Sequence, residues 1–184
     1  MNNLQIRKRV TKELTRVKAK KGIFSFVSGP QDYKIVNEEI MRYLTNKSRL
    51  SGLYVALSSP YTQISKELEA KKIHTENIVF IDGVTGKKSK TDSCVTLKNR
   101  NSLTELSLVM SQACKNKAIK FIFLDSVSTL LIYNNLEITE RFMNFFINKI
   151  KNLDLLMIMI SIEEDKSNKL MPVLAQFCDR SVKI

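Results

Sequence analysis

The sequence is poor in the residues that build several common kinds of site. It has one His, three Cys, five Gly, three Pro and no Trp among 184 residues. The single His74 excludes a zinc site built on two or more histidines, and it leaves no other imidazole as a general base for a Ser or Cys nucleophile. The three Cys have neither metal-ligand nor disulfide spacing, which favours a reducing, cytoplasmic setting.

Long apolar runs are also missing. The longest, such as 155–160, has about six residues, whereas a helix that crosses a bilayer needs about 20. No apolar segment follows the basic N-terminus, so no secretory signal peptide is expected. With 43% hydrophobic residues and little Gly or Pro, the chain is not of the disordered, collagen-like or low-complexity kind. We therefore expect one compact domain with a short appendage.

Acidic residues are too few to balance the basic ones. Lys and Arg number 30 against 18 Asp and Glu, a formal net charge of +12. Such an excess favours a polyanionic partner, nucleic acid or an anionic membrane surface. The abundance of Lys, Asn and Ile is equally typical of AT-rich coding. The charge is concentrated in residues 1–21, which hold eight Lys and Arg and a single Glu.

Residues 1–21 have the pattern of a basic amphipathic helix. Ile6, Val10, Leu14 and Val17 recur at helical spacing and form one apolar stripe beside the cations. Two interpretations stay open: the stripe packs on the protein's own core, or the helix docks on a membrane, a nucleic acid or a partner protein. The candidate residues for a polyanion or partner surface are Arg7, Lys8, Arg9, Lys12 and Arg16.

Residues 22–184 alternate short apolar runs with amphipathic segments, which predicts βα units and a mostly parallel sheet with helices on both faces. Five strands are expected, at 23–28, 53–58, 78–82, 121–125 and 155–161. A helix is expected after each, with starts at Pro60 and at the Ser102–Glu105 capping box. A further helix is expected over 138–150, with its phenylalanines in the core. Residues 83–100 are expected to form a long exposed connection.

The first strand leads into half of a phosphate-binding motif. A P-loop, G-x-x-x-x-G-K-[ST], places its amides and lysine around phosphates at a helix N-terminus. Counting from Gly29-Pro30 puts Lys34 at the second Gly, Ile35 at the lysine and Val36 at the hydroxyl that binds Mg²⁺. Lys34 remains a candidate for a phosphate contact in a loop one residue shorter. The fourth strand ends in Asp125-Ser126, as does a Walker B strand.

Several segments resemble the RecA/KaiC-like ATPases, and small archaeal KaiC-like proteins in particular. They keep their order along most of residues 22–184, and they are FIFLDSVSTLLIYN (121–134), RFMNFFINKIK (141–151), LYVALSSPY (53–61), NIVFIDGV (77–84), SLTELS (102–107) and LAQFCDRSVKI (174–184). The resemblance implies a RecA-like P-loop NTPase-type three-layer α/β fold. It also implies a Walker B Asp, matched by Asp125, and a catalytic Glu at the end of the second strand.

Where the resemblance implies the catalytic Glu, after the second strand, the sequence has Ser58 and Ser59, which cannot accept a proton from water at neutral pH. Glu163 and Glu164 follow the fifth strand and are alternative acids. The leading hypothesis is therefore a non-catalytic, regulatory or assembly domain, with Gly29, Pro30, Lys34, Asp125 and Ser126 as a vestigial nucleotide site. No catalytic residue and no metal ligand is assigned.

Two other functions stay open. One is a divergent ATPase, with Lys34 supplying charge and Asp125 the Mg²⁺ contact of bound ATP. The other is binding of nucleic acid or an anionic membrane by residues 1–21 and the basic segment 87–100. The resemblance to RecA-type domains also implies self-association or pairing with a relative as a mode of partnership.

Overall fold

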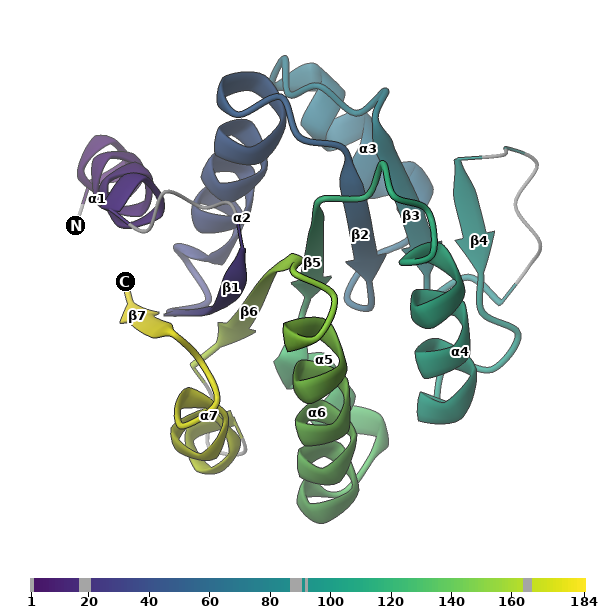
Figure 1. The fold of residues 1–184 in the computed structure, drawn as a ribbon. Helices are drawn as coiled ribbons and strands as arrows, with labels where there is room; N and C mark the ends of the chain where they lie inside the picture. The colour runs from purple at the N-terminus through teal and green to yellow at the C-terminus, as the bar shows by residue number, and fades with distance from the viewer. Residues whose placement is uncertain (1, 17–20, 87–90, 92, 164–166) are drawn as a thin grey trace.

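A single parallel sheet forms the centre of the molecule. The computed structural model describes residues 2–16, 21–86, 91, 93–163 and 167–184. Within these residues seven strands pair in the order β4-β3-β2-β5-β6-β1-β7 (Figure 1). They are β1 (Gly22–Ser28), β2 (Gly52–Ala56), β3 (Ile78–Asp82), β4 (Cys94–Thr96), β5 (Phe121–Asp125), β6 (Leu156–Ile162) and β7 (Arg180–Lys183).

Helices cover both faces of this sheet. On one face lie α1 (Asn3–Arg16), α2 (Tyr33–Arg42), the π-helical η1 (Tyr43–Lys47) and α3 (Tyr61–Ala70). On the other lie α4 (Leu103–Ala113), α5 (Val127–Tyr133), α6 (Leu136–Lys151) and α7 (Ser167–Ala175). The expected three-layer α/β fold is confirmed. Among the described residues, no helix is long and apolar enough to cross a membrane.

The central strands are apolar along their whole length because both of their faces are covered. Every residue of β2 and β5 is buried. Since successive side chains of a strand point to opposite faces, β5 sends Phe121 and Phe123 to the α2 and α3 side and Ile122 and Leu124 to the α4 to α7 side. This two-sided burial is what made five of the strands recognisable as continuous apolar runs.

The two edge strands were not expected. β4 lies within the segment 83–100 that the sequence indicated as a connection, and β7 lies near the C-terminus. Each is short and only one residue of each is buried, Cys94 in β4 and Val182 in β7. Neither strand therefore has an apolar run, and pairing with a neighbouring strand decides its conformation.

The apolar face of α6 is rotated from the one expected. Met143, Phe146, Ile147 and Ile150 are buried, and Phe142 packs beside them. Phe145 is 59% exposed, so its expected place in the core is wrong. Adjacent apolar residues on a helix lie about 100° apart, and only one of the pair Phe145 and Phe146 can face the sheet.

The two predicted helix N-termini, one after β2 and one after β4, lie close to the observed ones. The hydroxyl of Ser102 accepts a hydrogen bond from the Glu105 amide at 3.1 Å, as in a capping box. The Glu105 carboxylate does not complete the box, because it accepts from the amides of Lys98 and Asn99 instead. Pro60 stands one residue earlier than expected, at the N-cap of α3.

Helix α1 is docked on the protein's own core. Ile6, Val10 and Leu14 are buried in the same cluster as the side chains of α2 and β1. An ion pair between Glu13 and Arg180, 2.5 Å from Oε2 to Nη2, joins α1 to the start of β7. Val17, the fourth position of the predicted stripe, lies outside the described residues. The described part of the apolar stripe is thus covered by protein.

Two leucines of α1 provide a matched test of this docking. Leu14 is 1% exposed and Leu4 is 60% exposed. We expect Leu14→Ala to lower the free energy of unfolding by about 2–4 kcal/mol, because it removes buried methyl groups and leaves a cavity. Leu4→Ala, the same change on the exposed face, is expected to alter it by less than about 0.5 kcal/mol. Urea denaturation measures both, and equal effects would contradict the docking.

Candidate functional site

The carboxyl ends of four strands lie side by side at one edge of the sheet. β1, β6, β5 and β2 are parallel neighbours in that order, so their carboxyl ends share this edge. Ala56, the last residue of β2, is directly opposite Asp125, the last residue of β5. In open parallel α/β sheets this edge is where ligands bind. It carries all five residues of the predicted nucleotide site.

The loop from β1 to α2 is a tight turn that begins at Gly29. The amides of Asp32 and Tyr33 both donate to the carbonyl of Gly29, each at 3.1 Å. Pro30 has no N–H to offer. α2 then begins at Tyr33, and the Val36 amide donates to the Asp32 carbonyl at 3.0 Å. The turn therefore uses two of its amides internally, rather than pointing them toward an anion.

Lys34 lies on the first turn of α2 and is engaged by a carboxylate of α3. Its Nζ is 2.8 Å from Oε2 of Glu67, and its side chain is 60% exposed. Gln63, one turn earlier on α3, donates to Oε1 of the same carboxylate at 3.0 Å. The hydrogen bonds from Lys34 and Gln63 lower the pKa of Glu67, and the bond to Glu67 raises the pKa of Lys34. Lys34 thus bridges two helices.

The Asp125 carboxylate is buried and surrounded by hydrogen-bond donors. Asn37 Nδ2 donates to Oδ2 at 2.9 Å, and the Tyr54 hydroxyl donates to the same oxygen. The Ser58 hydroxyl donates to Oδ1 at 3.0 Å. Asn37 also donates to the Tyr54 oxygen at 2.9 Å, which closes the group. We call Asn37, Tyr54, Ser58 and Asp125 the Asp125 cluster; both carboxylate oxygens are used within it.

Burial dominates the acid–base behaviour of this cluster. It raises the pKa of Asp125 to about 8, and it raises the pKa of Tyr54 above its usual value as well. Removing a carboxylate from water disfavours its charged form, and no described cation pairs with this one. Below a pH of about 8 the protonated form of Asp125 is therefore favoured, and in that form one of its oxygens donates a hydrogen bond to a neutral partner in the cluster.

Ser126 follows Asp125 across a cis peptide bond and is fully buried. Its hydroxyl is 2.9 Å from the hydroxyls of both Ser128 and Thr129. Ser126 is also the N-cap residue of α5. These bonds turn its side chain toward the first turn of α5, and its recorded partners are the hydroxyls there rather than the residues of the β1–α2 loop.

A cavity of about 190 Å³ opens between α2 and α3 above the Asp125 cluster. The residues of the cluster form the polar inner wall of the cavity, and Tyr33, Lys34 and Glu67 also line it. The Tyr33 hydroxyl is 3.4 Å from the Ser58 hydroxyl. Of the predicted nucleotide-site residues, the structure brings Lys34 and Asp125 to this cavity, whereas Gly29, Pro30 and Ser126 are not part of its lining.

The positions considered for a general base carry no free carboxylate among the described residues. Ser58 belongs to the Asp125 cluster, and Ser59 lines the cavity beside it. Glu163 is paired with Lys183, whose Nζ lies 2.5 Å from its Oε1. Glu164 lies outside the described residues. In the described part of the chain, no group of three His, Cys, Asp or Glu side chains could hold a metal ion.

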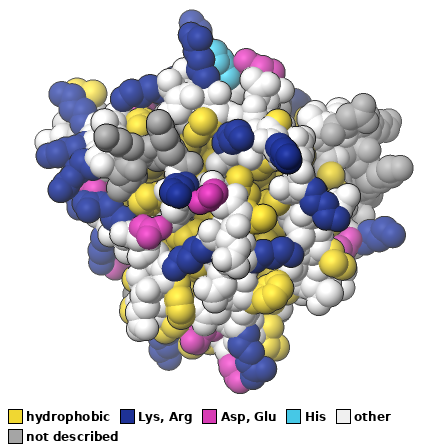
Figure 2. Space-filling model, viewed as in Figure 1, with side chains coloured by type: hydrophobic (Ala, Val, Ile, Leu, Met, Phe, Trp, Pro, Cys, Tyr) yellow, Lys and Arg dark blue, Asp and Glu magenta, His cyan; other side chains and the backbone are white. Residues whose placement is uncertain are grey.

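The five basic residues singled out in the sequence all lie on α1. Arg7 is drawn toward α2 by Glu38 and Glu39, at 2.9 and 3.1 Å. Lys8, Arg9 and Lys12 lie on the exposed side of the helix, with Arg16 at its end, 3.6 Å from Glu13. Figure 2 shows Lys and Arg side chains spread over the face in view and gathered at its left edge, where α1 lies.

Sequence reasoning missed the polar residues of α2 and β2 that organise this region. Asn37, Glu38 and Glu39 are all buried, at 8%, 6% and 9% exposure, between the apolar residues Val36 and Ile40. Tyr54 lies in the middle of a buried strand. The available signal was the position of three polar residues in one turn of a helix that has apolar residues on either side.

Asp82 offers a contrast to Asp125 within the same edge of the sheet. Its carboxylate accepts hydrogen bonds from the amides of Tyr61, Val84 and Thr85, at 3.0, 2.8 and 2.9 Å. Burial alone would raise the pKa of Asp82, but these bonds and the Thr85 hydroxyl outweigh it and hold the pKa below its usual value. Asp82 therefore stabilises the end of β3 and the start of α3 as a carboxylate.

These two carboxyl groups are predicted to have opposite pH dependences. The pKa of Asp125 is about 8 in the folded protein and about 4 when unfolded, so its contribution to stability falls as pH rises between those values. In that pH range the free energy of unfolding of the wild type falls, relative to that of Asp125→Asn, by up to about 1.4 kcal/mol per pH unit. For Asp82 the sign reverses: its contribution is present at neutral pH and is lost as pH falls below about 4.

The measurement is urea denaturation of the wild type, Asp125→Asn and Asp82→Asn at a series of pH values. The stability of Asp125→Asn relative to the wild type should improve steadily from pH 5 to pH 8, because the amide cannot ionise. Asp82→Asn should be less stable than the wild type at neutral pH and approach it in acid. A pH-independent difference for Asp125→Asn would contradict the protonated cluster.

Comparison with solved structures agrees with this architecture. The KaiC-like protein PH0186 from the hyperthermophilic archaeon Pyrococcus horikoshii has a TM-score of 0.66 and 9% identity, over 88% of this chain and 70% of that one. The uncharacterized protein PH0321 from Pyrococcus horikoshii, solved in complex with an unknown peptide, has a TM-score of 0.69 and 14% identity, over 94% of this chain and 82% of that one. These likenesses concern the fold.

The sequence itself matches a family model. No curated protein matches the sequence. The model described as the KaiC ATPase matches residues 40–182, from near the end of α2 to β7. The match begins after the β1–α2 turn and includes Asp125 and every strand except β1. The suspected resemblance is thereby confirmed, and the chain belongs to the KaiC ATPase family.

Proposed function

We propose that this chain is a KaiC-family domain that has lost nucleotide hydrolysis and acts by binding, in regulation or assembly. The observation that carries the proposal is the closed Asp125 cluster. In an active site of this kind the corresponding carboxylate is available to the hydration shell of Mg²⁺. Here both of its oxygens are engaged in hydrogen bonds with Asn37, Tyr54 and Ser58.

The residues present do not fit Mg²⁺ and a nucleotide triphosphate. Mg²⁺ takes oxygen ligands in strict octahedral geometry, and it is usually held through carboxylates and phosphates. A cation near Asp125 would have to displace hydrogen bonds from three neutral donors and ionise a carboxyl whose pKa is about 8. Val36 and Ile35 offer neither the hydroxyl nor the ammonium that a P-loop supplies.

The β1–α2 turn supports the same conclusion. A phosphate cradle depends on several amides that converge on the ligand. Two amides of this turn are bound to Gly29 and a third position is Pro30. The family match also begins downstream of this turn, at residue 40. Loss of the charge-stabilising groups for phosphoryl transfer costs orders of magnitude in rate.

A protein partner is the mode of action that fits this loss. A domain that keeps its fold without turnover can act through its surface. The Pyrococcus horikoshii protein PH0321, which shares the fold, was solved with a peptide bound. That observation favours a protein ligand for the present chain. Self-association or pairing with an active relative, as in RecA-type domains, is the form we propose for assembly.

Hydrolysis and binding of ATP with Mg²⁺ test the proposal directly. We expect no heat on calorimetric titration, no change of melting temperature at millimolar nucleotide, and phosphate release at the background rate. If ATP did bind, a concentration well above its dissociation constant would stabilise the protein by several kcal/mol.

Lys34→Ala and Asp125→Asn separate this proposal from the divergent ATPase. Lys34 is exposed, so its removal should leave the fold intact while it breaks only the ion pair with Glu67. Neither substitution should change the background rate of phosphate release. Turnover in the wild type that disappears in both variants would establish the ATPase and overturn the proposal.

A further inference from the structure

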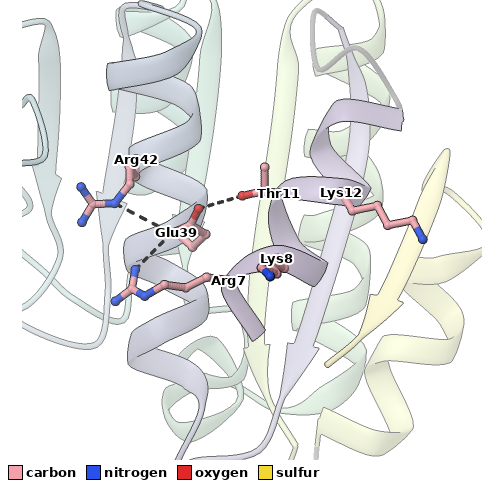
Figure 3. A pocket seen from close by; sticks show the side chains of 6 residues that line it. All are labelled: Arg7, Lys8, Thr11, Lys12, Glu39 and Arg42. Carbon is pink, nitrogen blue, oxygen red and sulfur yellow. Dashed lines mark hydrogen bonds and ion pairs between the residues drawn. The ribbon is translucent and has the colours of Figure 1, made fainter. Parts of the chain in front are cut away.

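A second concave surface lies outside the Asp125 cluster, between α1 and α2 (Figure 3). Its volume is about 530 Å³. We call it the α1–α2 groove, and its lining residues are Arg7, Lys8, Thr11, Lys12, Glu39 and Arg42. Four of these six side chains are cationic and one is acidic, so the lining has a net positive charge. The sequence indicated the α1 residues but not the contribution of α2.

Glu39 holds the Arg7 guanidinium at the floor of the groove. Arg42 lies beside it, with its own hydrogen bond to the Lys71 carbonyl at 3.1 Å. The Glu39 side chain is only 12% exposed, and its Oε2 is 3.1 Å from Arg7 Nη1 and 3.8 Å from Arg42 Nε. The Thr11 hydroxyl donates to Oε1 at 2.7 Å. Figure 3 shows Arg7 from α1 and Arg42 from α2 converging on this carboxylate. A guanidinium has five N–H donors, so each arginine keeps donors for a ligand.

Lys8 and Lys12 are the exposed cations of α1 beside the groove, and Figure 3 shows the Lys12 side chain extending away from Glu39 and Arg42. They are four residues apart and therefore lie on the same side of α1, one turn from each other. Both are exposed, and no ion pair joins either of them to a described acidic residue. Lys47 of η1 extends the basic rim, with its Nζ 3.5 Å from the Thr15 hydroxyl of α1.

The chemistry of the lining distinguishes between polyanions. An amphipathic helix binds a bilayer by burying its apolar face, and the apolar face of α1 is occupied by Ile6, Val10 and Leu14 in the core. Arginine clusters also bind acidic peptides, but tight peptide recognition adds apolar or aromatic anchors. The α1–α2 groove offers neither, since its lining consists of charged residues and Thr11. A phosphodiester chain needs only the charge and the N–H donors.

We propose that the α1–α2 groove binds the phosphate backbone of nucleic acid without reading its sequence. Lys8 and Lys12 contact phosphates at the rim, and Arg7 and Arg42 contact them from the floor. The formal charge of +12 draws the polyanion to the protein over a longer range. The proposal goes beyond the loss of ATP turnover and does not depend on it, because the groove shares no residue with the Asp125 cluster.

Paired lysine substitutions test the groove. Lys8→Ala with Lys12→Ala removes two exposed charges there, and Lys115→Ala with Lys117→Ala removes two exposed charges beyond α4 as a matched control. The probe is a short fluorescein-labelled single-stranded oligonucleotide of mixed sequence, as DNA and as RNA. Fluorescence anisotropy gives its affinity at salt concentrations between about 50 and 200 mM. Melting temperatures check that both variants remain folded.

For the wild type we expect affinity to fall linearly with the logarithm of salt concentration, independently of base sequence. Each phosphate contacted on a single strand contributes about 0.7 to that slope, so the groove variant should lose roughly 1.4 from it and bind about tenfold more weakly at intermediate salt. The control should match the wild type more closely. Equal loss in both variants, or no binding by the wild type, overturns the proposal.

Two further ligands distinguish the alternatives. Vesicles of neutral and anionic phospholipid and a polyglutamate peptide are tested under the same conditions with the same pair of variants. Weaker binding of both than of the oligonucleotide supports the proposal. Preference of the wild type for vesicles or for polyglutamate, lost in the groove variant, would assign the groove to a membrane or to an acidic protein and overturn the nucleic-acid proposal.

Discussion

Three consecutive polar side chains of α2, Asn37, Glu38 and Glu39, are buried, and burial obliges each to find a partner. Leaving a buried polar or charged group without a partner costs more free energy than a hydrogen bond to that group contributes. Asn37 meets this requirement with Tyr54 and Asp125, and the two glutamates meet it with Arg7 and Thr11 of α1. One turn of α2 thereby connects the Asp125 cluster on one side with the α1–α2 groove on the other.

Much of the fold could be predicted because the sheet is covered on both faces. Continuous apolar runs marked β1, β2, β3, β5 and β6, and alternating helices implied that the strands are parallel. The edge strands β4 and β7 carry no such signal, since pairing with one neighbour decides them. The error at Phe145 has a similar origin: two adjacent phenylalanines look alike in sequence, and only the direction of the helix selects Phe146 for the core.

The candidate site was predictable only in outline. Asp125 was found because it ends an apolar strand, and the basic α1 because its charges are close together in sequence. The partners of Asp125 come from α2, β2 and the segment after β2, and only folding brings them together. The sequence of α1 likewise left open whether its apolar stripe faces the core or a ligand, because an amphipathic helix has the same pattern in both cases.

The position of β1 has a consequence for the order in which the molecule is made. This strand pairs with β6 and β7, and Phe24 lies beside both Ile158 and Arg180. A ribosome that has just released β1 and α2 must therefore finish almost the entire domain before β1 acquires either neighbour. Contacts so distant in sequence slow folding, because a long loop must close first. The local packing of α1 on α2 is available much earlier and gives the nascent chain a cover for the apolar side of α2.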